Sequence, residues 1–497
     1  MKDFNYYLES IGEIGYVEQI TSAIVSGNGL PGVKPGELVL FENGTLGETL
    51  SINQDSIEIL LFSKNGLTSG TKMVRTNEFL KIPVGPELLG KIIDPLGNNL
   101  EGDIAPKTKL EKPITTNPTG ITTRKTIKRH LSTGAPVVDL ILPLGYGQKQ
   151  LVIGDRKVGK TDFLIQTVLT QANMGNICVY ASIGKRKIDI KKLKELFAKF
   201  KILNRVVIVG TGSEDPVGMI YLTPYSAMTI SEFFRDQGFD VLLVLDDLST
   251  HAKFYREIAL LGKRFPGRNS YPGDIFYAHA SLLERAGNFI TPKGEKAITC
   301  LPVAETMEGE LSGYIQTNLM SMTDGHLYFD SNLFAQGRRP SVNPFLSVTR
   351  VGKQTQSAVE RQITREILSF LTLFEKMQTF AHFGAELNET VRTTISVGQE
   401  IIKFFQQTPT SIMPINIQMF LFCLLWISIV QKSPTVLTFK KREDIENIIK
   451  LYKDNDDFRK KIDETINSAT SFNSLLGVIR EKKEELLGYN QEMNQEA

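Results

Sequence analysis

The chain has 497 residues, of which 41% are hydrophobic, and a formal net charge of +2. This length and composition predict a globular protein with two or three domains. The charges are spread along the sequence without a long block of one sign, so nothing indicates a nucleic-acid-binding surface or a polybasic membrane anchor. The three cysteines are far apart and form no C-x-x-C pair, so we expect reduced core residues in a cytosolic protein: Cys178, Cys300 and Cys423.

The first part of the chain shows the pattern of a small β-barrel. Residues Met1–Gly15 contain no apolar segment of signal-peptide length. From about Gly15 to Arg75, short β-branched runs alternate with glycine turns, and Glu37–Phe41 and Ile57–Phe62 are each followed by an Asn-Gly pair. We therefore predict an N-terminal β-barrel domain over residues 1–80.

A polar connection rich in proline and glycine follows, and strands then alternate with helices. Four continuous apolar runs predict buried parallel strands covered by helices on both faces: Leu151–Ile153, Cys178–Gly184, Val206–Val209 and Val241–Leu245. The predicted fold class is α/β, with this nucleotide-binding domain over residues 81–357.

The pattern changes again beyond Gln356, where long amphipathic segments predict a C-terminal helical domain over residues 358–497. We place the two domain boundaries near residues 80 and 357. The longest apolar stretch, Met419–Val430, is shorter than the roughly 20 residues needed to cross a bilayer, so it is predicted to be a buried helix.

The most informative motif is the segment 154–161, Gly-Asp-Arg-Lys-Val-Gly-Lys-Thr, between a predicted strand and a predicted helix. In a phosphate-binding loop of this kind, glycines bring backbone N–H groups against the phosphates, Lys160 meets the β and γ oxygens, and the Thr161 hydroxyl ligates magnesium. The chain is therefore predicted to bind a nucleoside triphosphate with Mg²⁺. The predicted contacts in this motif are Asp155, Arg156, Lys157, Val158, Gly159, Lys160 and Thr161.

A second candidate magnesium ligand is Asp246, which closes the apolar strand Val241–Leu245. Parallel-sheet nucleotide folds place at this position the carboxylate that holds magnesium, usually through water. Helix capping is the alternative role, because the next predicted helix begins at Leu248. We assign the neighbouring Asp247 to capping or structure.

Lys185 indicates that binding and hydrolysis are separated in this chain. It ends the strand Cys178–Gly184, at the place where hydrolytic proteins of this architecture keep a glutamate that polarises the attacking water. An ammonium group cannot serve as that base. We therefore expect the chain to bind a nucleotide without hydrolysing it.

Together with the phosphate-binding loop, four ordered motifs make the chain resemble the α subunits of the F-type rotary ATP synthase. The resemblance extends from about Gly15 through Gln418. The further motifs that carry it are Leu245–Ser249, Pro266–Asp274, Leu282–Ala286 and Leu346–Gly352.

The resemblance implies partners as well as a ligand. Three α and three β subunits of this family alternate around a rotating γ shaft, and the catalytic sites lie mainly on β. Arg350 is similar to the arginine that α inserts into the neighbouring active site, where it stabilises charge on the transferring phosphoryl group. Ser321 matches another α residue near that interface. The alternative role for Arg350 is an ion pair at the end of a strand.

The resemblance also assigns residues around the base of the bound ATP or ADP. Arg339 and Pro340 are similar to the Arg-Pro pair beside the adenine ring, and Gln407 aligns with a glutamine on its other side. A solvent-facing helical position is the alternative for Gln407. Asp162 departs from the small residue usual near the α-phosphate, and we expect it to turn away or to be neutralised by Lys157 or Lys185.

Two further departures from the family pattern leave open which kind of complex contains this chain. The family usually has glutamine where this chain has Lys185, and a longer N-terminal segment that binds the stator. The resemblance implies a cytoplasmic subunit held on the inner face of the bacterial membrane only through the larger complex. An ordinary ATP synthase or ATPase is the first hypothesis. The alternatives are a repurposed rotary motor that drives a surface or motility machine, and a self-sufficient hexameric ATPase.

Overall fold

The computed structural model describes residues 2–63, 66–102, 106–382, 389–430 and 442–493. These residues form two compact units. Unit 1 comprises Met1–Thr126, Gly147–Ile153 and Ala172–Asp324. Unit 2 comprises Ile127–Tyr146, Gly154–Gln171 and Gly325–Ala497.

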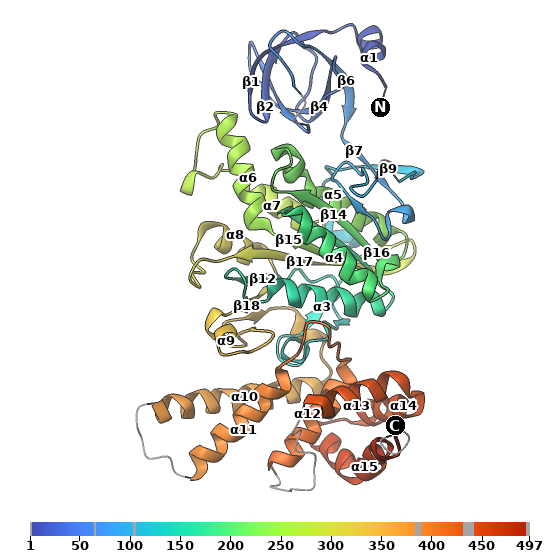
Figure 1. Cartoon of the computed structure of the whole chain (residues 1–497), viewed down its shortest axis with the longest axis vertical. Coiled ribbons are helices and arrows are strands. Elements are labelled where there is room, and N and C mark those ends of the chain that lie inside the picture. The colour runs from blue at the N-terminus through green and yellow to red at the C-terminus, as the bar shows by residue number, and fades with distance from the viewer. Residues whose placement is uncertain (1, 64–65, 103–105, 383–388, 431–441, 494–497) are drawn as a thin grey trace. The chain divides into compact units, whose positions relative to one another are not determined.

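Unit 1 begins with the predicted barrel, which is confirmed. Its antiparallel strands close into a barrel in the order β1-β2-β5-β4-β3-β6 (Figure 1). The interior of the barrel is apolar and includes Val39, Phe41, Ile59 and Met73. β3 and β5 occupy the two apolar runs that mark the barrel in the sequence. The strands are β1 (Gly15–Thr21), β2 (Ile24–Asn28), β3 (Glu37–Phe41), β4 (Leu46–Ile52), β5 (Ile57–Leu61) and β6 (Lys72–Phe79).

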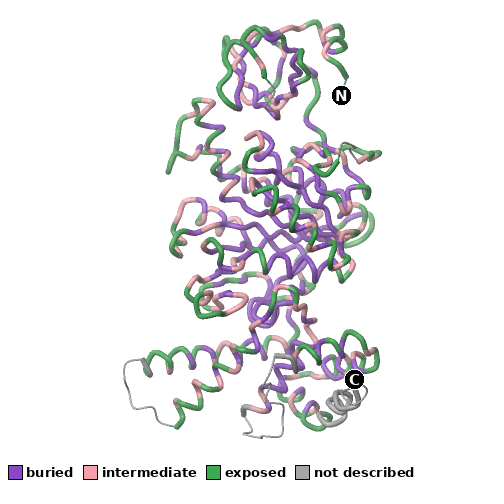
Figure 2. The backbone as a smooth tube through the Cα atoms, viewed as in Figure 1, coloured by how far each residue is buried: buried purple, intermediate pink, exposed green. Residues whose placement is uncertain are grey.

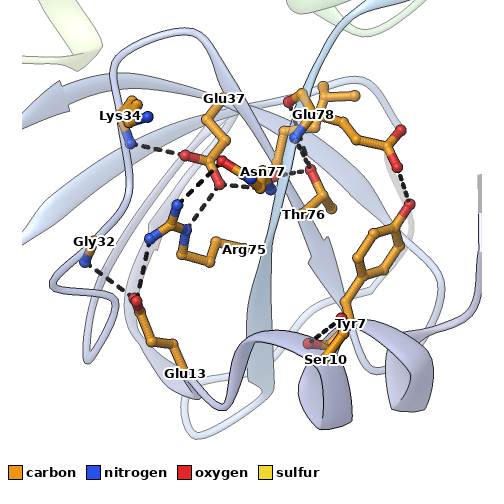
Figure 3. Close-up of polar contacts among 11 residues, drawn as sticks. Tyr7, Ser10, Glu13, Gly32, Lys34, Glu37, Arg75, Thr76, Asn77 and Glu78 are labelled. Carbon is orange, nitrogen blue, oxygen red and sulfur yellow. Dashed lines mark hydrogen bonds and ion pairs between the residues drawn. The ribbon is translucent and has the colours of Figure 1, made fainter.

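A short helix that the sequence analysis does not predict precedes the barrel. α1 (Phe4–Ile11) begins after Asp3, whose side chain accepts a hydrogen bond from the backbone N–H of Tyr6, 3.0 Å away. Tyr7 packs with Leu40 and Val74 of the barrel, and its hydroxyl donates to Glu78 Oε1 over 2.7 Å (Figure 3). An isolated helix of this length is unstable, so the barrel surface stabilises α1.

Arg75 links the segment after α1 to two strands of the barrel (Figure 3). Its guanidinium donates to Glu37 Oε1 over 2.9 Å and to Glu13 Oε1 over 3.1 Å. Glu37 also accepts the backbone N–H groups of Lys34, at 3.0 Å, and Asn77, at 2.7 Å. The buried carboxylate of Glu37 therefore has both a charge partner and hydrogen-bond donors, as a buried charge requires.

The second part of unit 1 is the predicted parallel sheet, with strand order β12-β17-β15-β13-β14-β8. Pairing is parallel from β17 to β8, and β16 adds antiparallel to β17. The core strands are buried along their length (Figure 2). The strands are β12 (Leu151–Gly154), β13 (Ile177–Lys185), β14 (Val206–Gly212), β15 (Val241–Asp246), β16 (Gly287–Thr291) and β17 (Gly294–Glu305).

Helices pack against this sheet, as continuous apolar strands require. α5 contacts β13, β14 and β15, whereas α6 contacts β13 and β17. The helices of this part are α4 (Lys187–Lys199), α5 (Val217–Asp236), α6 (Leu248–Leu261), α7 (Ile275–Leu283) and α8 (Tyr314–Met322).

The connection between the barrel and the sheet contains strands as well as turns. β7 (Lys81–Val84) pairs antiparallel with β9 (Leu110–Pro113), and β8 (Ile92–Ile93) pairs parallel with β14 at the edge of the sheet. The sequence pattern of this region predicts only a polar connection. Strands of two to four residues give too short an apolar pattern to be recognised without their partners.

Unit 2 contains the phosphate-loop helix and the C-terminal helices. α3 (Lys160–Asn173) starts in this unit, and β18 pairs antiparallel with β19. The other elements are β10 (His130–Leu131), α2 (Pro136–Asp139), β11 (Leu144–Gly145), β18 (Gly325–Phe329), α9 (Ser331–Ala335), β19 (Val348–Thr349), α10 (Ala358–His382), α11 (Glu389–Phe405), α12 (Ile415–Val430), α13 (Arg442–Asp454), α14 (Asp456–Ser468) and α15 (Phe472–Met493).

The predicted buried helix is α12, which packs against α14 and α15. Phe422 lies against Trp426 and Phe472, with ring centroids 5.6 and 6.2 Å away. Within the described part of the chain, no helix is both long enough and apolar enough to cross a membrane. β6 ends at Phe79 and α10 begins at Ala358, and the domain boundaries near 80 and 357 remain predictions.

Candidate functional site

The phosphate-binding loop connects β12 to α3, as the sequence predicts. Gly154 is the last residue of β12, and α3 begins at Lys160. Gly159 has φ +88°, a conformation that favours glycine, and a Cβ at Gly154 would lie 2.4 Å from the backbone oxygen of Phe329. Glycine is therefore required at both ends of the loop for local geometric reasons.

Lys160 and Ser341 hold the loop in shape. The Nζ atom of Lys160 donates to the carbonyl oxygens of Gly154, at 2.6 Å, and Asp155, at 2.5 Å. The hydroxyl of Ser341, which is fully buried, donates to the carbonyl oxygen of Val158 over 2.7 Å. The N-terminal N–H groups of α3 follow directly, and such a helix start favours anions through its unpaired donors and its dipole.

The exposed surface of this loop suits an anionic ligand. Thr161 is exposed in the first turn of α3, and Arg156 and Lys157 are exposed on the loop that precedes it. The predicted contact residues from Asp155 to Thr161 thus form one continuous loop and helix start. Phosphate oxygens are the ligand chemistry that this combination of backbone donors and cations fits.

A pocket of about 290 Å³ adjoins the first turns of α3 in unit 2. This volume is close to the lower end of the range for small-molecule sites, roughly 300–1,000 Å³. The pocket brings together five residues that are assigned to the nucleotide from the sequence: Gly159, Asp162, Arg339, Pro340 and Gln407. Its lining comprises Gly159, Asp162, Phe163, Gln166, Gly337, Arg339, Pro340, Gln406, Gln407, Thr408 and Pro409.

Gln407 is buried in this pocket wall, so the alternative of a solvent-facing helical position is wrong. It follows the end of α11, and its exposed fraction is 4%. Its backbone N–H donates to the carbonyl oxygen of Arg339 over 2.7 Å. Its side-chain Oε1 accepts from Gln166 Nε2 over 3.0 Å, and its Nε2 donates to the Gly134 carbonyl oxygen over 3.1 Å. Gln407 therefore fixes the segment that carries Arg339.

Arg339 is the cation that acts on Asp162. Partial burial raises the pKa of Asp162, and the charge of Arg339 opposes that shift. The guanidinium of Arg339 stacks 3.4 Å from the ring centroid of Phe334 and donates to the Phe334 carbonyl oxygen over 2.8 Å. The sequence-based expectation names Lys157 or Lys185 and does not include Arg339, which comes from a loop distant in sequence; that expectation remains a prediction.

Lys185 in unit 1 is paired with two carboxylates. Residues Ser182 and Asp246 are register partners on the adjacent strands β13 and β15, which brings Lys185 to the end of β15. Its Nζ lies 3.0 Å from Asp246 Oδ1 and 3.1 Å from Asp247 Oδ2. Burial lowers the pKa of Lys185, but the two carboxylates outweigh burial and raise it overall. Lys185 is thus a fixed cation.

Asp246 and Asp247 have different further partners. The other oxygen of Asp246, Oδ2, accepts the hydroxyl of Tyr180 over 2.8 Å. Asp247 caps α6, because its Oδ1 accepts the backbone N–H of Thr250 over 2.5 Å. Capping therefore belongs to Asp247, as expected from the sequence, and not to Asp246.

These contacts do not fit the predicted magnesium role of Asp246. Magnesium requires near-octahedral oxygen coordination and keeps several of its waters. At Asp246 an ammonium group already lies on one carboxylate oxygen and a hydroxyl on the other. A divalent cation would meet the like charge of Lys185 at this position. The apolar run predicts a carboxylate at the end of a strand, whereas its neighbours Lys185 and Tyr180 depend on how the strands pack.

Arg350 is exposed on the bend that follows β19. Thr349, the last residue of β19, anchors the bend by donating to the Pro143 carbonyl oxygen over 2.9 Å. The alternative of a strand-end ion pair is not observed, since no carboxylate within the described ranges lies in salt-bridge distance of Arg350. Burial lowers the pKa of His326, and the charge of Arg350 lowers it further. Within the part of the chain that the structure describes, Arg350 therefore presents an exposed guanidinium without an ion-pair partner.

Ser321 belongs to unit 1 and is exposed near the end of α8. Its hydroxyl donates to the carbonyl oxygen of Asn318 over 2.7 Å. This local contact neither supports nor excludes a role at a subunit interface. The assignment of Ser321 remains a prediction.

Two residues of the site are absent from the sequence-based assignment. Gln166 lines the pocket one helical turn after Asp162, and Ser341 follows the predicted Arg339-Pro340 pair directly. The four-residue spacing on α3 places Gln166 on the same helix face as Asp162 and is a signal that could have identified it. The contact of Ser341 with the loop depends on tertiary structure.

Comparison with known proteins agrees with this geometry. The family model described as ATP synthase alpha/beta family, nucleotide-binding domain, matches residues 134–349, and the model of the ATP synthase alpha/beta chain, C terminal domain, matches residues 356–481. The ATP synthase subunit alpha of Dictyoglomus turgidum is 38% identical over 415 residues, 83% of this chain and 82% of the relative. The ATP synthase subunit alpha of Staphylococcus aureus strain JH9 is 35% identical over 434 residues, which cover 87% of this chain and 86% of that relative.

Proposed function

The chain belongs to the ATP synthase alpha/beta family, and we propose that it is a subunit that binds ATP or ADP without hydrolysing it and completes the catalytic site of a neighbouring subunit. The observation that carries the proposal is Lys185, which ends β13 where a hydrolytic subunit would need a carboxylate. Its ammonium group is paired with Asp246 and Asp247. A paired cation cannot accept a proton from an attacking water.

Nucleotide binding is supported by the two parts of the site in unit 2. The phosphate-binding loop supplies N–H donors and Lys160 for the phosphates. The adjoining pocket, with Pro340 and the stacked guanidinium of Arg339, offers a flat apolar and cationic surface for a base. The proposed ligand contacts are the loop from Asp155 to Thr161 together with Asp162, Arg339, Pro340 and Gln407.

The proposed catalytic contribution is Arg350 acting in trans. An exposed arginine without an ion-pair partner in the described ranges has its full charge available to a second protein. In the arrangement we propose, three copies alternate with three β subunits around a γ shaft. Each copy extends Arg350, with Ser321 near the same interface, toward the phosphates bound by its β neighbour. The complex would hold the chain at the inner face of the membrane.

Replacing Lys160 with alanine tests nucleotide binding. Because charge-assisted hydrogen bonds contribute about 1.5–3 kcal/mol each, the isolated chain should bind ATP about 10- to 100-fold more weakly. Isothermal titration calorimetry measures the affinity, and turnover of the complex should remain largely intact. Lys403→Ala on the exposed surface of α11 is the control, since the Lys403 side chain is 65% exposed. Equal affinities of the Lys160 variant and the wild type would contradict the proposal.

Replacing Asp162 with asparagine should strengthen nucleotide binding. Asp162 lines the proposed base pocket in the first turn of α3, and its negative charge opposes phosphate binding. We expect affinity for ATP to rise by about three- to tenfold, which corresponds to the modest Coulomb energies of partly exposed charges. Asp162→Glu, which keeps the charge, should stay near the wild-type value. A weaker affinity of the asparagine variant would show that Asp162 assists binding instead.

Which machine the complex drives is a separate part of the proposal. We propose coupling to proton transport, as in an ATP synthase, with a repurposed motor as the alternative. Purification of the chain at its natural level, followed by mass spectrometry of the co-purifying subunits, distinguishes the two. Membrane-rotor subunits support the first, whereas β and γ with unfamiliar proteins and no rotor support the second. Fast ATP hydrolysis by the isolated chain would favour a self-sufficient ATPase.

A further inference from the structure

Gln166 is a buried polar side chain in the wall of the pocket beside α3. Only 2% of it is exposed, and it lies one helical turn after Asp162. It lines the pocket of about 290 Å³, and every residue of that lining belongs to unit 2. Polar groups inside a small-molecule pocket are few, and they decide which ligand is accepted. The hydrogen bonds of Gln166 therefore bear on the choice of ligand.

The orientation of the Gln166 amide follows from its neighbours. Its Nε2 lies 2.9 Å from the carbonyl oxygen of Gly134, 3.0 Å from that of Ser411 and 3.0 Å from Gln407 Oε1. A carbonyl oxygen can only accept a hydrogen bond, so the reverse orientation of the amide would place oxygen against oxygen. Nε2 therefore faces these three acceptors, and Oε1 of Gln166 is directed away from them.

The amide oxygen of Gln166 has no donor within the described ranges, where the hydrogen bonds of this side chain all use Nε2. Oε1 is not among the polar atoms that the described residues enclose completely without a partner, so it reaches an accessible surface. The accessible space beside Gln166 is the pocket that it lines. A nearly buried amide oxygen needs a hydrogen-bond donor, and a ligand in the pocket can supply one.

Gln407, the other buried glutamine of the pocket, uses both ends of its amide within the protein. Its Oε1 accepts from Gln166, and its Nε2 donates to the carbonyl oxygens of Gly134, over 3.1 Å, and Ser411, over 3.2 Å. Gln407 thus holds Gln166 in place, whereas Gln166 keeps its oxygen for the ligand. This acceptor is fixed before a ligand binds, which lowers the cost of ordering it on binding.

Gln166 lies away from the phosphate end of the pocket. Gly159 of the phosphate-binding loop lines the same pocket, together with Arg339 and Pro340. Gln166 follows the start of α3 at Lys160 by six residues, which is roughly 9 Å along the helix axis. A nucleotide whose phosphates lie at the start of α3 therefore has room to extend its base toward Gln166.

We propose that Gln166 Oε1 accepts a hydrogen bond from the exocyclic amino group of adenine and so selects adenine nucleotides over purine nucleotides that lack this group. The inference rests on the proposed nucleotide binding and adds the residue that recognises the base. The amino group of adenine is a hydrogen-bond donor. A purine without it leaves the amide oxygen unpaired in the pocket, and a site built to hydrogen-bond its ligand discriminates against such an analogue.

The test compares the binding of ATP and of purine riboside triphosphate, which lacks the amino group, to the isolated full chain. Isothermal titration calorimetry measures both affinities in the same magnesium-containing buffer. ATP should bind about tenfold more tightly, the effect of one hydrogen bond to a nearly buried group. Equal affinities would overturn the inference while leaving the proposed function intact. Absence of binding by both nucleotides would overturn the proposed function itself.

Replacing Gln166 with methionine identifies the group responsible. Methionine is unbranched and similar in length, and Gln407 Nε2 still donates to the carbonyl oxygens of Gly134 and Ser411 in this variant. The lost acceptor affects ATP alone, so the two affinities should agree within about twofold. A purely structural role of Gln166 would weaken both nucleotides equally. A tenfold preference for ATP that persists in Gln166→Met would therefore overturn the inference.

Two further glutamine variants are the controls. Gln171→Met is matched to Gln166→Met, because Gln171 is also buried on α3 but lies outside the pocket lining. Its amide already donates to the Ser132 carbonyl oxygen and accepts the Tyr146 hydroxyl, so the preference for ATP should remain about tenfold. Gln406→Met should also keep this preference. Loss of the preference in Gln406→Met, with retention in Gln166→Met, would assign the amino group to Gln406 and overturn the inference.

Discussion

Replacing Arg350 with alanine should lower the ATP turnover of the assembled complex by on the order of 10³-fold or more, the effect of removing an arginine finger. The reason is electrostatic. Negative charge spreads over the transferring phosphoryl group in the transition state, and a guanidinium fixed nearby stabilises it more than it stabilises the bound substrate. Such a loss corresponds to about 4 kcal/mol of transition-state stabilisation.

The structure indicates that this substitution should leave the fold of the subunit intact. Arg350 is exposed and has no ion-pair partner in the described ranges, and the bend is anchored instead by Thr349 and Gly352. The complex should therefore assemble with normal stoichiometry, which native mass spectrometry measures. Nucleotide binding to the isolated chain should also be unchanged, because this affinity depends on the loop around Lys160.

The control for Arg350 is another exposed arginine of unit 2. Arg365→Ala, on α10, removes the same side chain from a surface position and should leave turnover within about twofold of wild type. A complex with Arg350→Ala that assembles and turns over at the wild-type rate would exclude the arginine-finger role. Equal losses of turnover in Arg350→Ala and Lys160→Ala would contradict the proposed division between catalytic and non-catalytic sites.

Replacing Arg285 with alanine should destabilise unit 1 by about 3–5 kcal/mol, the usual effect of removing one member of a buried ion pair. The Arg285 side chain is 2% exposed and forms a bidentate ion pair with Glu232. Its Nε donates to Oε1 over 3.0 Å and its Nη2 to Oε2 over 2.8 Å. It also donates to the Ile114 carbonyl oxygen over 2.9 Å and to the Thr229 hydroxyl over 2.7 Å. The substitution leaves Glu232 buried without its counter-ion.

The measurement must report on unit 1. The single tryptophan, Trp426, lies in unit 2, so its fluorescence does not follow the region around Arg285. Hydrogen–deuterium exchange of peptides from α5 and β17 is suitable, and exchange there should accelerate in Arg285→Ala while α12 remains protected. Thermal melting followed by far-UV circular dichroism gives the accompanying change in stability.

Two controls separate the lost charge partner from other effects. The double substitution Arg285→Met with Glu232→Met removes both charges and should be much less destabilising than Arg285→Ala, because no buried charge is left unpaired. Lys112→Ala breaks a partly exposed ion pair with Asp236 and should lower the free energy of unfolding by no more than about 1 kcal/mol. If Arg285→Ala were as mild as Lys112→Ala, the buried pair would contribute little to stability.

Much of the fold follows from local sequence patterns. The apolar runs at Val206–Val209 and Val241–Leu245 lie within β14 and β15, because a strand buried on both faces requires continuous apolar side chains whatever its neighbours are. The glycines and Lys160 of the phosphate-binding loop can likewise be recognised from a short stretch of sequence. Their roles depend on backbone geometry within one turn between a strand and a helix.

The environment of the candidate site is less predictable. Gln407 is buried beside Arg339 and Gln166, although the alternative of an exposed helical position could not be excluded from sequence alone. The charge of Arg339, on a loop far along the chain, opposes the rise that burial causes in the pKa of Asp162. Such contacts depend on how distant segments pack, and a local pattern contains no information about that packing.

The sequence by itself determined the barrel, the parallel sheet, the buried helix α12 and the phosphate-binding loop, because each depends on residue periodicity or on the geometry of a few adjacent residues. Only the tertiary structure decided the contacts of Asp246. Its position at the end of a strand suits a magnesium ligand, but the register of β13 beside β15 places Lys185 and Tyr180 on its two oxygens. Electrostatic roles depend on the distances between charges, and the packing of strands and loops fixes those distances.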